Sequence, residues 1–114
     1  MAFGDGGDDY LRVEVAAGSR DEARRLADGV VAARLAACAQ ISGPITSVYR
    51  WAGQIQAEEE WRLVLKTTGG RFAELTAYLA DHHSYDVPEI IAVPIEGGHP
   101  EYLDWVAEST RGEE

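Results

Sequence analysis

Hydrophobic and polar residues change their spacing along the chain, and each spacing predicts one type of element. Residues 10–16 alternate between apolar and polar side chains, which indicates a strand with one face in a core. From Arg20 to Leu35 the apolar side chains recur every three or four positions, which predicts an amphipathic helix. Ser19 and Glu22 have the spacing of a capping box, so we expect this helix to begin near Arg20.

Two extended runs follow, and they are predicted to form a long hairpin. Residues 38–51 make the outgoing strand and residues 54–67 the returning strand, with a tight turn at Ala52 and Gly53. Pro44 lies inside the outgoing run. Because proline has no N–H to donate to a sheet, we expect a bulge or bend at this point.

The second half of the chain repeats the change from helical to extended spacing. Residues 71–82 predict a second helix with one apolar stripe, and residues 90–95 predict a buried strand. Pro88 separates the two elements, because the residue before a proline is pushed toward extended geometry. Pro100 is then expected to open a last, short helix.

The order of the predicted elements indicates the fold class. A strand, a helix, two strands, a helix and a strand are followed by an added C-terminal helix. Two βαβ-type halves of this kind form one antiparallel sheet with both helices on one face, so we predict an α+β fold, the ferredoxin-like βαββαβ sandwich. The domain is expected to cover residues 10–109, between a flexible N-terminal tail over residues 1–9 and a polar tail over residues 110–114.

The predicted hairpin is longer than the usual strand of about 5–6 residues. It carries large apolar side chains at Val48, Tyr49, Trp51, Ile55 and Trp61. A hairpin surrounded by water should not be this apolar, so it either bends back onto its own core or pairs with the sheet of another chain. Helices on one face leave the other face of the sheet uncovered, which favours pairing with another chain.

Composition and charge narrow the classes of function. The chain has 114 residues, which is the size of one domain, and a net charge of -10. This charge argues against nucleic-acid binding and favours a general attraction for cations. No apolar run reaches the roughly 18 residues of a membrane-spanning helix. Cys38 is the single cysteine, which excludes an intrachain disulfide, and without a signal-peptide pattern we expect a cytoplasmic protein.

The densest group of chemically active side chains lies in residues 82–89, between the second helix and the last strand. His83 is a candidate metal ligand, because imidazole is the commonest neutral ligand in proteins. His82 is explained by a favourable charge interaction at the helix C-terminus. Cys38 is either a small buried residue or a soft ligand for copper. With the carboxylate of Glu89, these residues give His83, Cys38 and Glu89 as the candidate metal site.

Glu89 also has a second interpretation. A carboxylate beside an apolar run needs a partner if it is buried, and Lys66, on a strand predicted to be central, is the natural candidate. The two residues form either a plain ion pair or part of an anion- or metabolite-binding pocket between subunits, lined by Lys66, Tyr85 and Trp51. The acidic run at residues 58–60 is expected to be a solvated face.

Catalytic motifs are missing from the sequence. It contains no glycine-rich phosphate loop, no nucleophile elbow and no His-x-x-x-His pair. Nothing in the sequence orients Cys38 and His83 as a nucleophile and its base. We therefore expect a binding function and no catalysis.

Five segments occur in the order and spacing of a known family. They are LAACAQI at residues 35–41, GPITSVYRWAGQI at 43–55, EWRLVLKTT at 60–68, HSYDVPEI at 83–90 and YLDW at 102–105. The chain resembles the CutA family of divalent-cation tolerance proteins, over roughly residues 11–108. This resemblance implies a ferredoxin-like protomer in a tight homotrimer that exchanges its long hairpins between subunits, similar in architecture to the PII signalling proteins. It also implies tolerance of copper and other divalent cations.

The chain departs from the family pattern at several positions. Ser84 stands where the family commonly has proline, Asp86 where glutamate is common, and Gln54 where a basic residue is usual. With Cys38 alone, a polythiol copper site within one subunit is excluded. We predict a cytoplasmic, non-catalytic homotrimer that binds copper, as Cu(II), or another divalent cation in clefts between subunits. The alternatives are a PII-like sensor of a small metabolite and a protein-interaction scaffold.

Overall fold

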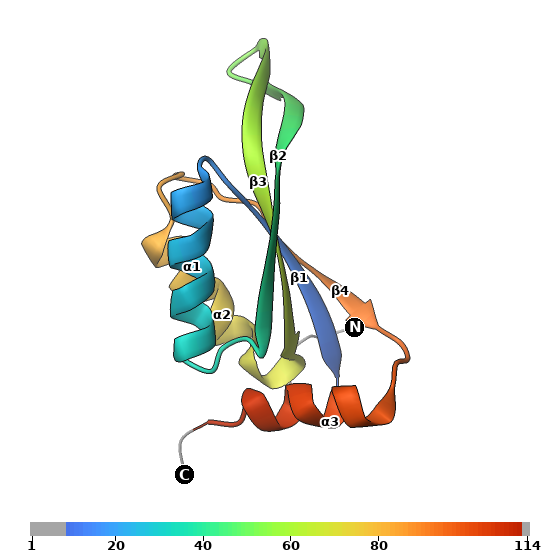
Figure 1. Cartoon of the computed structure of the whole chain (residues 1–114). Helices are drawn as coiled ribbons and strands as arrows, with labels where there is room; N and C mark the ends of the chain where they lie inside the picture. The colour runs from blue at the N-terminus through green and yellow to red at the C-terminus, as the bar shows by residue number, and fades with distance from the viewer. Residues whose placement is uncertain (1–8, 113–114) are drawn as a thin grey trace.

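A computed structural model of the chain describes residues 9–112. Its elements, in chain order, are β1 (Tyr10–Ala17), α1 (Arg20–Ala32), β2 (Cys38–Trp51), β3 (Gln54–Thr68), α2 (Gly69–His82), β4 (Ile90–Ile95) and α3 (Pro100–Ser109) (Figure 1). The predicted order of elements is confirmed. The predicted flexible tail over residues 1–9 lies outside the described residues except for Asp9, whose carbonyl accepts a hydrogen bond from the Gly69 N–H.

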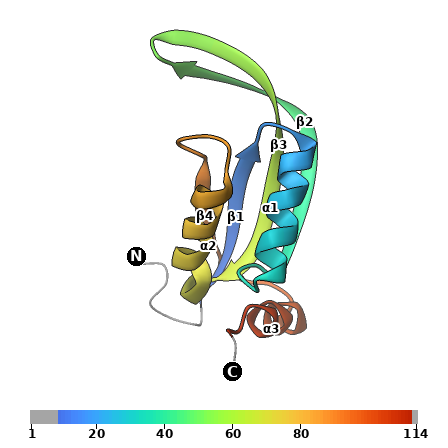
Figure 2. The same ribbon diagram turned by 90° about the vertical axis from the view of Figure 1, so that its left-hand side faces the viewer.

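The four strands form one antiparallel sheet in the order β2-β3-β1-β4. Helices α1 and α2 lie on one face of this sheet, and α3 crosses one end of it (Figures 1 and 2). This is the predicted α+β, ferredoxin-like arrangement. The central strand β1 is in register with β3 from Tyr10↔Thr68 to Ala17↔Trp61, so it holds the two halves of the fold together.

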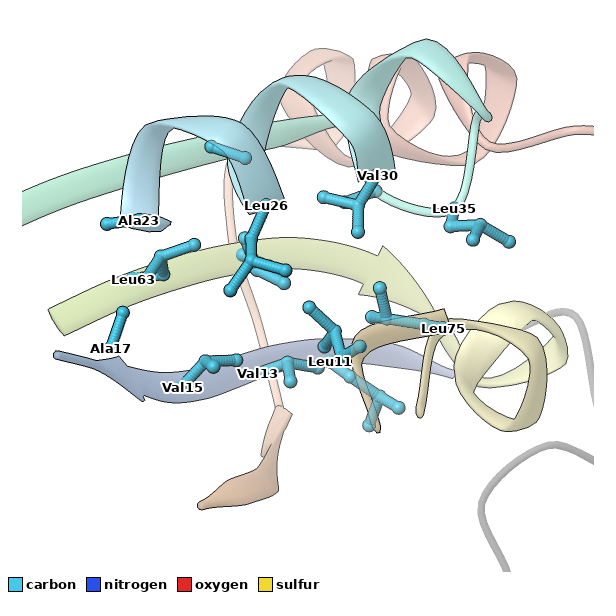
Figure 3. Packing of buried hydrophobic residues seen from close by; sticks show 14 residues of the cluster. Leu11, Val13, Val15, Ala17, Ala23, Leu26, Val30, Leu35, Leu63 and Leu75 are labelled. Atoms are coloured by element: carbon cyan, nitrogen blue, oxygen red, sulfur yellow. The ribbon is translucent and has the colours of Figure 1, made fainter. Parts of the chain in front are cut away.

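The core lies between the sheet and the two helices. β1 contributes every second residue, and these side chains meet those of α1 and of β3 (Figure 3). The largest fully buried side chains in this cluster are Leu11, Val13, Val15, Leu26, Val30, Leu63, Leu65, Leu75 and Leu79. Because successive strand residues point to opposite faces, the intervening residues of β1 and β3 lie on the open face, away from α1 and α2.

Helix α1 ends earlier than its apolar stripe predicts. It stops at Ala32, and Arg34 adopts a left-handed conformation with φ of 61°. The Leu35 N–H then donates to the Val30 carbonyl and the Arg34 N–H to the Val31 carbonyl, which is the Schellman pattern of helix termination. Leu35 is therefore buried as the apolar residue after the cap and not as part of the helix.

The last helix is attached to this same cap. The Arg34 side chain donates from Nε to the Arg111 carbonyl at 3.0 Å and from Nη2 to the Glu108 carbonyl at 3.1 Å. Thr110, predicted to begin a polar tail, is buried and donates from its hydroxyl to the Val106 carbonyl at 2.8 Å. The first residues of that tail are thus fastened to the domain, and residues 113–114 lie outside the described part.

Strands β2 and β3 continue past the edge of the sheet as a two-stranded hairpin. We call residues 45–60 the outer hairpin; here β2 and β3 pair only with each other, and the hairpin curves away from the sheet (Figure 2). The register shifts between Ser42 and Ile45, so the predicted bulge at Pro44 is confirmed. Gly43 has φ of 148°, and a Cβ there would lie 2.6 Å from Trp61 Cδ1. Glycine is therefore needed where the outer hairpin begins.

Candidate functional site

The loop after α2 brings His83 against the end of β1. Its side chain is fully buried. Nδ1 lies 3.1 Å from the Tyr85 N–H, and Nε2 lies 2.7 Å from the Ala16 carbonyl oxygen. Because the Tyr85 N–H can only donate, Nδ1 accepts and Nε2 donates to Ala16, which assigns one tautomer. Both ring nitrogens therefore have partners within the chain. The neighbouring His82 stacks on Tyr78 and contacts its carbonyl, as its position in the last helical turn suggests.

Glu22 is the buried carboxylate of this region, with 5% of its surface exposed. It accepts hydrogen bonds from the Ser84 N–H at 2.8 Å, the Ser84 hydroxyl at 3.0 Å and the Gly18 N–H at 3.3 Å. Burial raises the pKa of Glu22, but the hydrogen bonds from Ser84 and Gly18 outweigh burial and leave this pKa below its usual value. The two donors of Ser84 show why serine fits here, since proline has no N–H to offer.

Tyr85 connects the same loop to the outer hairpin. Its hydroxyl donates to Glu60 Oε2 at 2.8 Å, and its ring lies 4.7 Å from that of His83. Burial and this hydrogen bond to a carboxylate raise the pKa of the Tyr85 hydroxyl, so it stays protonated and able to donate. The loop is thus tied to α1 through Ser84 and to β3 through Tyr85.

A cavity of about 550 Å³ lies between this loop and the outer hairpin. Its ionisable walls are the carboxylates Glu58, Glu60, Asp86 and Glu89, and its aromatic walls are Tyr49, Trp51 and Tyr85. Within the described part of the chain, no lysine or arginine lines it. We call this space the acidic cavity. A cavity with carboxylates and no basic side chain favours cations.

The three candidate metal ligands are not brought together within one chain. Glu89 lines the acidic cavity, and His83 is enclosed behind it. Cys38 is in register with Lys66, nearer the opposite end of the sheet, and contacts the Tyr102 hydroxyl at 3.6 Å. Within residues 9–112, no three His, Cys, Asp or Glu side chains lie close enough together to hold a metal ion. A site made by His83, Cys38 and Glu89 stays a prediction for an assembly of several chains.

Lys66 does not pair with Glu89, so that expectation is wrong. The Lys66 ammonium donates to Gln40 Oε1 at 3.2 Å, whereas Glu89 lies 4.0 Å from Arg62 Nη1. Lys66 also lines a second cavity, of about 360 Å³, apart from the one lined by Tyr85 and Trp51. The predicted ligand pocket of Lys66, Tyr85 and Trp51 is therefore divided between two places in the single chain.

Two features of the site were missed from the sequence. Glu22 was interpreted only as part of a capping box, although it precedes Leu26 by four residues and Val30 by eight and so lies on the apolar stripe. The run at residues 58–60 was interpreted as a solvated face, yet Glu60 is half-buried and accepts from Tyr85. Helical spacing could have identified Glu22, but the contact of Glu60 depends on tertiary folding.

Comparisons with known proteins agree with one another. A family model described as CutA1 divalent ion tolerance protein matches residues 11–109. The chain is 45% identical over 92 residues to the divalent-cation tolerance protein CutA of Thermus thermophilus, covering 81% of this chain and 89% of that protein. It is 42% identical over 99 residues to the chloroplastic protein CutA of Arabidopsis thaliana, covering 87% of this chain and 54% of that protein. The chain thus spans about half the length of that plant relative.

Solved structures extend the likeness to the fold. The divalent cation tolerance protein CutA1 of Thermus thermophilus superimposes with a TM-score of 0.88 at 41% identity, covering 90% of this chain and 99% of that one. CutA1 of Oryza sativa gives a TM-score of 0.89 at 39% identity, covering 92% and 96%. In the described part of the chain, none of the helices has the length and apolar character needed to span a bilayer.

Proposed function

The chain belongs to the CutA1 divalent ion tolerance family, and we propose that it works as a homotrimer that binds a divalent cation without catalysing a reaction. Copper(II) is the first ion to test, and the clefts between subunits are the proposed place of binding. We propose the cytoplasm as the location, although one relative is named chloroplastic and another periplasmic.

The outer hairpin supports assembly. Val48, Trp51 and Ile55 are 68%, 60% and 70% exposed within the single chain, and all three belong to the two strands that pair only with each other. Clusters of exposed apolar side chains mark contact surfaces, and soluble homo-oligomers form closed symmetric assemblies. The open face of the sheet adds Ile91, which is also exposed. A second and third copy of the chain would cover the outer hairpin and the part of the open face around Ile91.

Light scattering on the purified protein tests the assembly. We expect the mass of three chains at micromolar concentration. Ile55→Glu places a charge in the outer hairpin and is expected to lower the mass, whereas Val31→Glu, at an exposed apolar residue of α1, should leave the trimer intact. A wild-type protein with the mass of one chain would overturn the proposal.

The acidic cavity is the observation that carries the cation proposal. Of the residues that the structure describes, four carboxylates and no basic side chain line it, and carboxylate oxygens are ligands for divalent cations. Three-fold assembly would repeat this cavity and bring side chains of neighbouring subunits to it. Glu89 is the predicted ligand that already faces the cavity. His83 would have to give up its contact with Ala16 or Tyr85 to bind an ion, and Cys38 its contact with Tyr102.

Calorimetric titration with Cu(II) tests this proposal. We expect saturable binding to the wild-type protein and weaker binding to Glu89→Gln. Asp28→Asn, at an exposed carboxylate of α1 paired with Arg24, is the control of equal charge and should bind like the wild type. Binding unchanged in Glu89→Gln would remove Glu89 from the site, and unchanged binding in His83→Ala would remove His83. No saturable heat with the wild type would contradict cation binding itself.

A further inference from the structure

Two cations face each other on the open side of the sheet. Arg12 of β1 is in direct register with Lys66 of β3, and the same row continues to Cys38 on β2 and Val93 on β4. Side chains in direct register lie on the same face, and like charges placed this way destabilise a sheet. In a chain with 10 basic and 20 acidic residues, such a pair calls for a compensating anion.

The compensation within the chain is incomplete. Arg12 Nη2 lies 3.1 Å from Glu14 Oε2, so one of the two charges is paired. Lys66 has only the neutral amide oxygen of Gln40, at 3.2 Å. Across residues 9–112, no carboxylate lies within ion-pair distance of Lys66. Arg62 shares Glu14 with Arg12 and lies 4.0 Å from Glu89, so the group formed with Lys66 holds three cations and two carboxylates. Within the single chain it therefore keeps one uncompensated positive charge.

A cavity of about 360 Å³ opens directly over this charge. Among residues 9–112, Arg12 and Lys66 are its only charged walls. The cavity lies between the sheet, the glycines of the β4–α3 connection and the start of α3. The remaining walls are Val93, Pro94, Ile95, Gly97, Gly98, Tyr102 and Leu103. No residue is shared with the acidic cavity. The second cavity thus has mostly apolar walls and one uncompensated positive charge.

We propose that this second cavity binds a small carboxylate carried on an apolar body. A single net positive charge matches a monoanion better than it matches phosphate. Arginine has five N–H donors and lysine three, so both side chains keep donors for a carboxylate after their contacts with Glu14 and Gln40. The apolar walls bind the hydrocarbon part and shield the ion contacts from water. This site does not depend on cation binding in the acidic cavity.

Amide NMR of the assembled, full-length protein tests the site with sodium hexanoate as the probe. Sodium chloride at equal ionic strength serves as the blank, because the screening of charges by salt alone changes the amide chemical shifts of exposed residues. We expect saturable shifts at the amides of Lys66, Gly97 and Gly98. Lys66→Gln should raise the dissociation constant roughly tenfold, because it removes a charge-assisted hydrogen bond. Arg24→Gln makes the same change of net charge on exposed α1 and should leave the constant within about twofold.

The other probes limit the class of ligand. Acetate, which lacks the hydrocarbon, is expected to bind more weakly than hexanoate, and inorganic phosphate more weakly still. Equal affinities for acetate and hexanoate, or tighter binding of phosphate, would overturn the assignment to an apolar carboxylate. The site itself is refuted by an absence of saturable shifts with hexanoate, or by a Lys66→Gln protein that binds hexanoate as the wild type does.

Discussion

The two halves of β3 have different neighbours in the structure. Residues 61–68 pair with β1 on one side, and residues 62–66 also pair with β2 on the other. This segment places Leu63, Leu65 and Thr67 in the core. Residues 54–60 pair only with β2, and most of their side chains are exposed. We call β1 with residues 61–68 the inner sheet. Residues 54–60 pair with β2 along their whole length, but no layer of helices covers the outer hairpin (Figure 2).

This difference separates two uses of apolar side chains. In the inner sheet they stabilise the single chain by leaving water on folding. In the outer hairpin Trp51 and Ile55 remain exposed when the chain folds, so only a contact with another molecule would remove them from water. If the chain assembles as proposed, stability depends on the inner sheet and assembly on the outer hairpin, which are consecutive parts of the same strand pair.

The largest expected effect is at the inner sheet. Leu65→Ala removes a fully buried side chain and should lower the free energy of unfolding by about 3 kcal/mol. Ile55→Ala is the matched change in the outer hairpin. It should lower the part of the free energy of unfolding that does not depend on protein concentration by less than about 0.5 kcal/mol. Guanidinium unfolding over a hundredfold range of protein concentration separates the two. Equal, concentration-independent losses would contradict the distinction between the halves.

The junction between the halves is the next most sensitive point. Gly43→Ala puts a Cβ 2.6 Å from Trp61 Cδ1 at a backbone conformation that favours glycine, and we expect a loss of about 2 kcal/mol. Gly70→Ala, in the first turn of α2 with no atom within 4 Å of the added Cβ, should instead be neutral or stabilise slightly. Thermal unfolding of both variants gives the comparison. A Gly43→Ala protein as stable as Gly70→Ala would show that the junction tolerates side chains.

The loop at residues 83–89 contacts β1 of the inner sheet through His83 and the outer hairpin through Tyr85. Glu22 fixes the end of the loop that packs against β1. Glu22→Gln should cost about 1–2 kcal/mol at pH 7, because the buried acceptor of Ser84 and Gly18 loses its charge. The pKa of Glu22 is lowered in the folded state, so its stabilising effect is present above the unfolded value of 4.5 and is lost as the pH falls through the folded pKa.

Guanidinium unfolding at pH 7 and below pH 4.5 measures this effect. The gap between wild type and Glu22→Gln should narrow in acid. Glu74→Gln, at an exposed carboxylate of α2 paired with Arg71, is the control and should show no measurable loss at either pH. A gap between wild type and Glu22→Gln that does not change with pH would mean that the loop does not depend on the ionised carboxylate.

Most of the fold could be predicted from the spacing of apolar residues, because the strands and helices differ in period. The bulge at Pro44 followed from the missing N–H. The pairing of Lys66 with Glu89 could not be judged this way, because strand register is set by tertiary contacts. Lys66 is in register with Arg12, whereas Glu89 lies near Arg62. Arg62 precedes Lys66 by four residues on β3, which separates these two positions by about 13 Å.

The candidate site was less predictable than the fold for a related reason. The sequence pointed to residues 82–89 but not to the carboxylates opposite them, because Glu22 and Glu60 come from α1 and β3. Side chains far apart in the sequence meet only through the packing of helix on sheet. The same holds for Arg12 beside Lys66, which no local pattern indicates.

The smallest effect concerns the link from the loop to the outer hairpin. Tyr85→Phe removes the hydroxyl that donates to Glu60 and should cost about 1 kcal/mol, which corresponds to roughly fivefold faster amide hydrogen exchange in residues 54–60. Tyr49→Phe removes an equally short bond, to Glu58, but this bond is exposed and water can replace it, so exchange should change by less than about twofold. If Tyr85→Phe exchanges like the wild type, the loop does not hold the hairpin. The position of the hairpin would then depend on its own strands and on neighbouring chains.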